Sequence, residues 1–202
     1  MKRETEEQPL ELSVEEVSDN VRRVVATALD IDEDDVKLES SLFELGAESL
    51  DLLDIAFMLE KDYRIQYPGT GLLDRASQYF AKDTLSSNGV VTDLGLQLLR
   101  MGMPELDPAA LKPGLKEVDV AKMVQVGSFV RITLRLLAAK AEYPRVCTKC
   151  GGELVESEVT PEFECAGCGD IVPVPSGDDI LLADLIRMYE GVTQDPGRQE
   201  EQ

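Results

Sequence analysis

The chain has 202 residues, of which 43% are hydrophobic, so it is long enough for one domain with an appendage and apolar enough for a true core. Twenty Lys and Arg against forty Asp and Glu give a net charge of -20, which argues against binding nucleic acids or anionic membranes through the general surface and favours basic protein partners. The absence of histidine excludes a nucleophile activated by histidine within this chain and any histidine-ligated catalytic metal.

The first twelve residues are polar and acidic, which predicts a flexible acidic tail. Residues 1 to 16 are charged throughout and lack the apolar core of a secretory signal. No apolar run approaches membrane-spanning length. We therefore expect a cytoplasmic protein without membrane insertion.

A first helix is predicted to begin after Ser13, because Ser13-Val14-Glu15-Glu16 matches a capping box. Apolar residues then recur every three or four positions and define one buried face: Val14, Val17, Val21, Val24, Val25 and Ala28. The acidic run over residues 30 to 35 ends this pattern. Residues 36 to 48 are expected to form a long loop that is docked by its apolar side chains Leu38, Leu42, Phe43 and Leu45.

Ser49 stands where this loop is expected to become a second helix. Apolar residues follow in two adjoining stripes, so we expect this helix to be largely buried; the stripes are Leu53, Phe57 and Met58, and Leu52, Ile55, Ala56 and Leu59. Acidic side chains are expected on its exposed strip, namely Asp51, Asp54, Glu60 and Asp62. Free N–H groups and the macrodipole of a helix N-terminus would stabilise a phosphodiester on Ser49. The simpler alternative is that Ser49 is an ordinary N-cap.

The stretch around Ser49 resembles the acyl carrier protein family, whose members carry phosphopantetheine on the serine of an Asp-Ser-Leu motif. The resemblance lies in the order of Phe43, Leu45-Gly46, Glu48-Ser49-Leu50 and a helix end at Tyr63 to Pro68. Here Glu48 replaces the aspartate, which bears on the choice of modifying enzyme rather than on the fold. The resemblance implies a four-helix bundle, 4′-phosphopantetheine on Ser49 and no catalytic residue. It also implies a phosphopantetheinyl transferase and acyl-loading, acyl-modifying or acyltransferase enzymes as partners. Their basic patches would dock on Glu48, Leu50, Asp51, Asp54 and Glu60.

After Pro68 the resemblance weakens, and residues 69 to 117 are predicted to be an insertion. Turn signals at 69–71, 86–89 and 112–114 separate two helix-like segments, 72–80 and 92–101. Residues 118–124 and 128–141 are expected to supply the third and fourth helices of the bundle. Three roles are open for this insertion. It would widen a pocket that shelters a tethered chain, form a second surface on which an enzyme docks, or only add packed residues to the hydrophobic core.

Two matched Cys-x-x-Cys knuckles predict a metal site formed by Cys147, Cys150, Cys165 and Cys168. With strands expected at 153–159 and 162–164, they resemble a structural zinc ribbon, in which metal binding contributes on the order of 10–16 kcal/mol to folding. Iron in a rubredoxin-like centre and a thioredoxin-like dithiol are less favoured alternatives. The acidic side chains around the knuckles favour protein contact over nucleic acid. Residues 176 to 192 predict a further helix.

Together these patterns predict a mainly α chain with short β-strands near its C-terminus. We expect a flexible acidic tail (1–12), an acyl-carrier-like domain (13–141, insertion about 69–117), a four-cysteine zinc ribbon (142–175), and a C-terminal helix and tail (176–202). The expected function is a specialised, non-catalytic carrier that holds acyl intermediates as thioesters, in lipid or fatty acid biosynthesis. A peptidyl or aminoacyl carrier and an unmodified adaptor that binds proteins through its ribbon are the alternatives.

Overall fold

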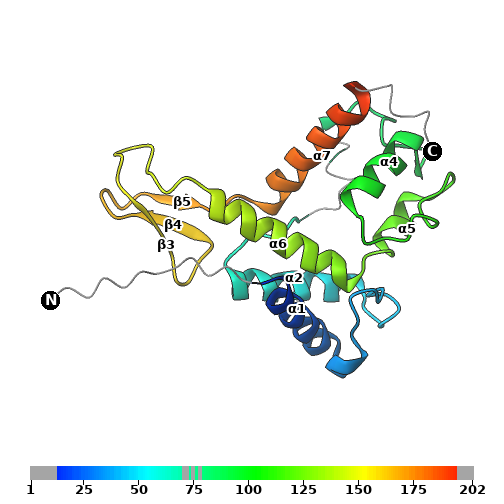
Figure 1. Cartoon of the computed structure of the whole chain (residues 1–202), viewed down its shortest axis with the longest axis horizontal. Helices are drawn as coiled ribbons and strands as arrows, with labels where there is room; N and C mark the ends of the chain where they lie inside the picture. The colour runs from blue at the N-terminus through cyan, green and yellow to red at the C-terminus, as the bar shows by residue number, and fades with distance from the viewer. Residues whose placement is uncertain (1–12, 70–72, 74–75, 77–78, 195–202) are drawn as a thin grey trace.

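The computed structural model describes residues 13–69, 73, 76 and 79–194; the predicted acidic tail therefore lies outside the described residues. Helices dominate the fold, and the described residues also form one two-stranded and one three-stranded antiparallel sheet. This confirms the predicted fold class. Figure 1 shows three parts: helices α1, α2 and α6 packed together, a small sheet beyond one end of α6, and α4, α5 and α7 beyond its other side.

Three helices form the main core: α1 (Val14–Leu29), α2 (Ser49–Tyr63) and α6 (Val126–Glu142). The capping box predicted for α1 is present, because Ser13 Oγ accepts a bond from Glu16 N–H at 3.1 Å and the Ser13 N–H donates to Glu16 Oε2 at 2.7 Å. The valine face of α1 packs against both other helices. The short helix α5 (Glu117–Ala121) precedes α6, close to where a third helix was expected.

The loop between α1 and α2 is fastened to the start of α6. It contains a short 3-10 turn, η1 (Glu33–Asp35), and Leu42 is completely buried in the main core. Leu42 N–H donates to Val124 C=O at 3.1 Å, and Gly127 N–H donates to Leu38 C=O at 2.8 Å. Because Leu42 is buried and the loop is hydrogen-bonded to the start of α6, the loop holds the start of α2 at a fixed position.

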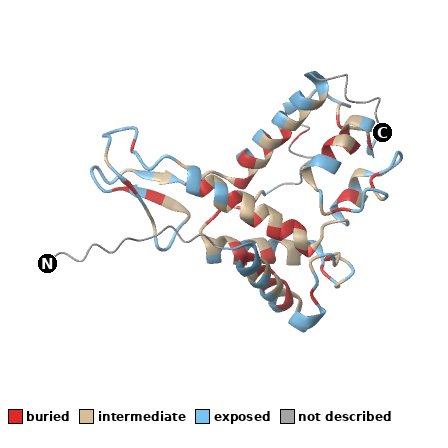
Figure 2. Cartoon of the chain, viewed as in Figure 1, coloured by how far each residue is buried: buried red, intermediate tan, exposed pale blue. Residues whose placement is uncertain are grey.

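The prediction that α2 would be largely buried is wrong. Its buried side chains are Ile55 and Leu59, whereas Leu53 and Phe57 of the other stripe are 59% and 66% exposed. Both stripes are apolar, but α1 and α6 cover only one of them, so the second remains on the surface. Figure 2 shows buried residues along α1 and α6 where these helices pack together. The outer face of α2 is therefore an apolar ridge rather than an acidic strip alone.

The insertion has small cores of its own. Of the predicted helix over 72–80, residues 73, 76 and 79 are helical, and residues 72, 74–75 and 77–78 lie outside the described residues. The predicted second segment is α4 (Asp93–Gly102), whose side chains Leu96, Leu98 and Leu99 are buried. A hairpin that the sequence analysis missed, β1 (Ser86–Ser87) with β2 (Val90–Val91), precedes it and turns at the predicted signal.

The cysteine knuckles lie on a sheet of three antiparallel strands, β3 (Leu154–Glu156), β4 (Glu162–Cys165) and β5 (Ile171–Pro173). The last of these strands was not predicted. Helix α7 (Gly177–Gln194) then returns and packs against α4 and α6 (Figure 1). Gly177 N–H donates to Gln66 C=O at 2.8 Å, and a Cβ at residue 177 would come within 2.6 Å of the same oxygen, so only glycine permits this approach.

Candidate functional site

Ser49 is the first residue of α2, and its side chain is exposed. The N-cap is Glu48 instead, in an extended conformation with φ -99° and ψ 173°, and its N–H donates to Asp51 Oδ2 at 2.7 Å. The Ser49 side chain makes no hydrogen bond to any described residue. The interpretation of Ser49 as an ordinary N-cap is therefore wrong, and its hydroxyl is available at a helix N-terminus.

The residues before Ser49 explain why it points outward. Gly46 has φ +94°, a conformation that costs other residues more than glycine, and it turns the chain toward the bundle. Ala47 is then buried against the main core, and its N–H donates to Leu42 C=O at 2.9 Å. With Ala47 held inside, the next residues emerge at the surface, and α2 begins there.

The five residues predicted to recognise partners all lie along α2, but they differ in their surroundings. Glu48, Leu50 and Asp54 are exposed, and Leu50 keeps 71% of its surface. Asp51 and Glu60 are half-buried, and each accepts a bond from a backbone N–H: Asp51 from Glu48, and Glu60 from Tyr67 at 2.7 Å. Those two carboxylates thus also hold the two ends of α2, a role that the sequence analysis missed.

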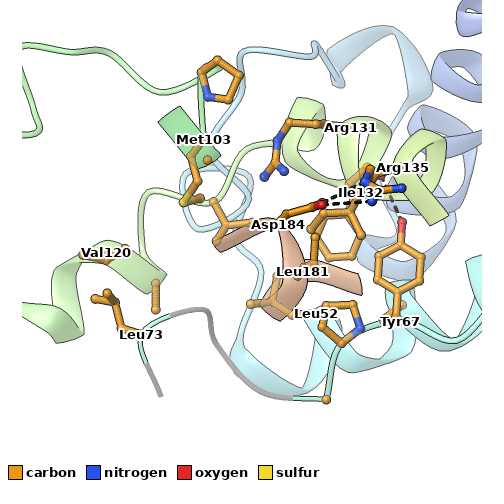
Figure 3. Close-up of a pocket in the computed structure, with 18 of the residues that line it drawn as sticks. Leu52, Tyr67, Leu73, Met103, Val120, Arg131, Ile132, Arg135, Leu181 and Asp184 are labelled. Atoms are coloured by element: carbon orange, nitrogen blue, oxygen red, sulfur yellow. Dashed lines mark hydrogen bonds and ion pairs between the residues drawn. The ribbon is translucent and has the colours of Figure 1, made fainter. Parts of the chain in front are cut away.

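A cavity of about 740 Å³ opens beside α2. Figure 3 shows side chains from α2, α5, α6 and α7 turned toward it, including Leu52, Val120, Ile132 and Leu181. Met103, just after α4, closes the side opposite α2 and α6. Most of the lining is apolar, and the volume falls in the range of roughly 300–1,000 Å³ that is usual for small-molecule sites.

Two arginines of α6 hold the added segments around this cavity. Arg131 donates two bonds to the carboxylate of Glu105 at 2.9 and 3.2 Å, and Arg135 donates two to Asp184 of α7 at 2.7 and 2.9 Å. Although burial opposes it, the Arg135 guanidinium lowers the pKa of Asp184. Neither pair was predicted from the sequence, although two arginines one helical turn apart on a predicted amphipathic helix were a signal for them.

The structure brings the four predicted metal ligands together. The Sγ atoms of Cys147, Cys150, Cys165 and Cys168 all lie within 4.8 Å of one another, with Cys150 and Cys165 at 3.4 Å and Cys147 and Cys168 at 3.8 Å. A tetrahedron with Zn–S bonds of roughly 2.3 Å has edges of roughly 3.8 Å, so the donor set fits a tetrahedral metal. Four thiolates without an open position suit a structural ion.

Backbone geometry supports the two knuckles symmetrically. Gly151 and Gly169, each one residue after the second cysteine of its knuckle, have φ +73° and +71°, the left-handed turn that the glycines were predicted to permit. Backbone N–H groups, first that of Cys168 and then that of Gly167, lower the pKa of the Cys165 thiol to about 7, although burial opposes this.

The carboxylate of Glu156 joins the sheet to the bundle, and Arg64 also donates to Glu158 C=O at 3.3 Å. Glu156 of β3 forms ion pairs with Lys140 near the end of α6, with Arg64 at 3.4 Å just after α2, and with Arg145 at 3.9 Å. Lys140 is buried and also donates to Tyr63 C=O at 3.0 Å. Burial lowers the pKa of Lys140, and Glu156 opposes that shift.

Comparison with known proteins identifies the stretch that contains Ser49. Residues 19–77 match the family described as phosphopantetheine attachment site. The acyl carrier protein of Campylobacter lari is 42% identical over 53 residues, which are 26% of this chain and 69% of that protein; the one from Campylobacter curvus is 42% identical over 55 residues, 27% and 71% respectively. This chain belongs to the acyl carrier protein family.

Membership has direct consequences. It implies 4′-phosphopantetheine as the cofactor, and a phosphopantetheinyl transferase and acyl-handling enzymes as partners, in a family that is generally non-catalytic. The family match covers the α1 to α2 region and leaves the knuckles and α7 unmatched. No solved structure matches this chain. Among the described residues, none of the helices has the length and apolar character needed to cross a bilayer.

Proposed function

We propose that Ser49 is the attachment point of phosphopantetheine and that the protein carries acyl intermediates as thioesters on that arm without catalysing their chemistry. The observation that carries this proposal is the exposed side chain of Ser49, free of hydrogen bonds to described residues, at the N-terminus of a helix inside the matched segment. A phosphodiester there gains from the helix dipole and from free backbone N–H groups. The reactive thiol would belong to the arm.

Partner enzymes would dock along the outer face of α2. Its exposed apolar ridge and the exposed carboxylates Glu48 and Asp54 support contact with an apolar patch rimmed by basic side chains. The surplus of acidic residues in the chain would speed such encounters at low salt. General nucleic acid binding does not fit this charge.

In this proposal the chain is organised as a carrier domain over residues 13–141 with its insertion at about 69–117, a zinc ribbon over 142–175 and a helix and tail over 176–202. A separate cluster of buried side chains around the knuckles supports the zinc ribbon as a unit of its own. Helix α7 shares buried clusters with the bundle, through Ile180, and with the insertion, through Leu185. Zinc is the proposed metal because four thiolates enclose the site; iron would suit the same donors. The cytoplasm is the proposed location, because its reducing conditions keep paired cysteines available as metal ligands.

The experiment is the intact mass of three proteins after incubation with coenzyme A and a broad-specificity phosphopantetheinyl transferase: the wild type, Ser49→Ala and Ser13→Ala. Ser13 is a matched control because it is also an exposed serine at a helix start, the N-cap of α1. We expect one arm on the wild type and on Ser13→Ala and none on Ser49→Ala. Circular dichroism would establish that all three are folded.

An arm that appears on Ser49→Ala would refute the assignment of the residue. No arm on any protein, while a control carrier is modified, would refute the carrier function with this enzyme class and favour an unmodified adaptor. The adaptor would then depend on the metal-bound sheet for partner contact.

A further inference from the structure

We propose that the turn between β3 and β4, residues 157–160, is a second recognition element that extends the docking face of α2. Its occupant is an acyl-handling enzyme whose apolar pocket, rimmed by basic side chains, receives Val159 while the same enzyme contacts the apolar ridge of α2. This inference rests on the proposed carrier function. The turn lies outside residues 19–77, the segment that matches the family, so membership of the family gives the turn no role.

The turn is fastened beside the end of α2. Arg64, the first residue after α2, donates to Glu158 C=O at 3.3 Å and forms an ion pair with Glu156 at 3.4 Å. Glu156 also pairs with Lys140 of α6, so both helices hold the strand that leads into the turn. In Figure 1 the sheet lies on the side where α2 ends. The turn therefore has a defined position relative to the docking face.

The turn displays one apolar side chain in a fixed conformation. Ser157 Oγ accepts bonds from the N–H groups of Val159 at 3.3 Å and Thr160 at 3.2 Å. Ser157 N–H donates to Glu162 C=O at 2.9 Å, which closes the base of the turn. Val159 nevertheless keeps 86% of its surface exposed. Because the turn is ordered before binding, a partner that buries Val159 loses little free energy to ordering it.

One partner is large enough to reach both elements. Leu50, Leu53 and Phe57 lie at helical spacing on the outer face of α2, and all three are exposed. From Ser49 to Tyr63, α2 is roughly 20 Å long at 1.5 Å per residue. A specific interface of standard size covers roughly 800 Å² on each partner, which is roughly 30 Å across for a round patch. An enzyme seated on the ridge therefore also reaches the turn at the end of α2.

Charge selects the class of partner. The exposed carboxylates of Glu48, Asp54 and Glu158 outnumber the exposed ammonium of Lys61 along this face, and the whole chain has a net charge of -20. Basic side chains around an apolar pocket complement such a surface. A second copy of the chain would place acidic groups against acidic groups, and a nucleic acid would add further negative charge.

The first measurement is photo-crosslinking of the full chain in the cells that make it. Benzoylphenylalanine replaces Phe57, Val159 or Val118, and mass spectrometry identifies the protein that each position captures. Val118 is a matched control, because it is a valine that is 66% exposed on α5, in another part of the molecule (Figure 1). We expect Phe57 and Val159 to capture the same acyl-handling enzyme and Val118 not to capture it.

The second measurement is the dissociation constant of that enzyme, purified, for the carrier with its arm attached. Val159→Lys replaces an apolar contact with a cation that faces the basic rim, so the dissociation constant should rise about tenfold or more. Val118→Lys should leave it unchanged. Circular dichroism and the mass of the attached arm establish that each variant is folded and loaded. If Val159→Lys does not fold, Val159→Ser gives the same readout with a smaller rise.

The outcomes separate this inference from the carrier function. Absence of a cross-link from Val159, or equal dissociation constants for the wild type and the folded Val159 variant, overturns the inference while the carrier function stands. Capture of different proteins at Phe57 and Val159 overturns the single partner, and a shared partner without acyl chemistry overturns its class. Failure of the wild type to accept any arm overturns the proposed function itself.

Discussion

The carrier bundle and the cysteine-bearing sheet are stabilised in different ways. Among the described residues, seventeen buried side chains form the main core, which α1, α2, α6, the loop between α1 and α2, the residues just after α2 and Ile180 of α7 share. The sheet has five, two of which are cysteines. The core of the bundle is large enough to stabilise its fold by burial of apolar surface, whereas the core of the sheet is not. The bundle should therefore be independent of metal, and the sheet should depend on it.

Metal removal should have the largest effect, and it tests directly whether the sheet depends on metal while the bundle does not. Stripping the ion with a chelator, or replacing a ligand in Cys165→Ser, should unfold residues 146–174 and leave the bundle helical. The expected loss is on the order of 10 kcal/mol of metal-binding free energy, which is also folding free energy for so small a unit. Limited proteolysis read by mass spectrometry would locate the cleavage sites.

Thr148→Ala is the matched control, since residue 148 lies between two ligands and is exposed. It should retain both metal and protease resistance. Protection of the sheet after complete loss of the ion would show that the apolar cluster of Phe163, Leu154 and Val174 is sufficient by itself.

A pair of substitutions on α2 tests the other side of the comparison. Leu59 is fully buried, and Leu59→Ala should cost about 2–5 kcal/mol through lost burial and a residual cavity. Phe57, two residues earlier and 66% exposed, should tolerate alanine within about 0.5 kcal/mol. Urea denaturation followed by helical circular dichroism measures both. Similar costs at the two positions would mean that the outer ridge of α2 is covered in solution.

That pair also shows where sequence reasoning was limited. Local signals were sufficient for the start of α1, for the turn glycines of the knuckles and for the approximate bounds of α4, α6 and α7, because each depends on residues within a few positions. The position of Ser49 at the start of α2 was predicted for the same reason. Which apolar stripe of α2 is buried was not predictable, since it depends on how many helices pack on it.

Contacts between distant residues were missed for a similar reason. Arg131 and Glu105 are 26 positions apart, and Arg135 and Asp184 are 49 apart, so no periodicity links them. The cavity that they border is built by the bundle, by the insertion predicted within the carrier domain and by the C-terminal helix. Its existence follows from tertiary packing, which no local pattern in the sequence reveals.

A smaller effect than that of metal removal or of Leu59→Ala is expected at Glu156, where the two regions meet. In Glu156→Gln, Lys140 loses the carboxylate that opposes the effect of burial, so the pKa of Lys140 should fall further below its ordinary value of 10.5. Because the Glu156 side chain is 27% exposed and a glutamine can still accept a hydrogen bond there, stability should decrease by only about 1 kcal/mol. Carbon NMR of the lysine side chain against pH reads the shift directly, and Glu164→Gln, at an exposed position of β4, should leave it unchanged. An unchanged pKa of Lys140 in Glu156→Gln would mean that this carboxylate does not connect the sheet to the bundle. A lowered pKa would show that the sheet, which should depend on metal, and the bundle, which should depend on burial, are coupled at this ion pair. Loss of the ion would then also expose the buried Lys140.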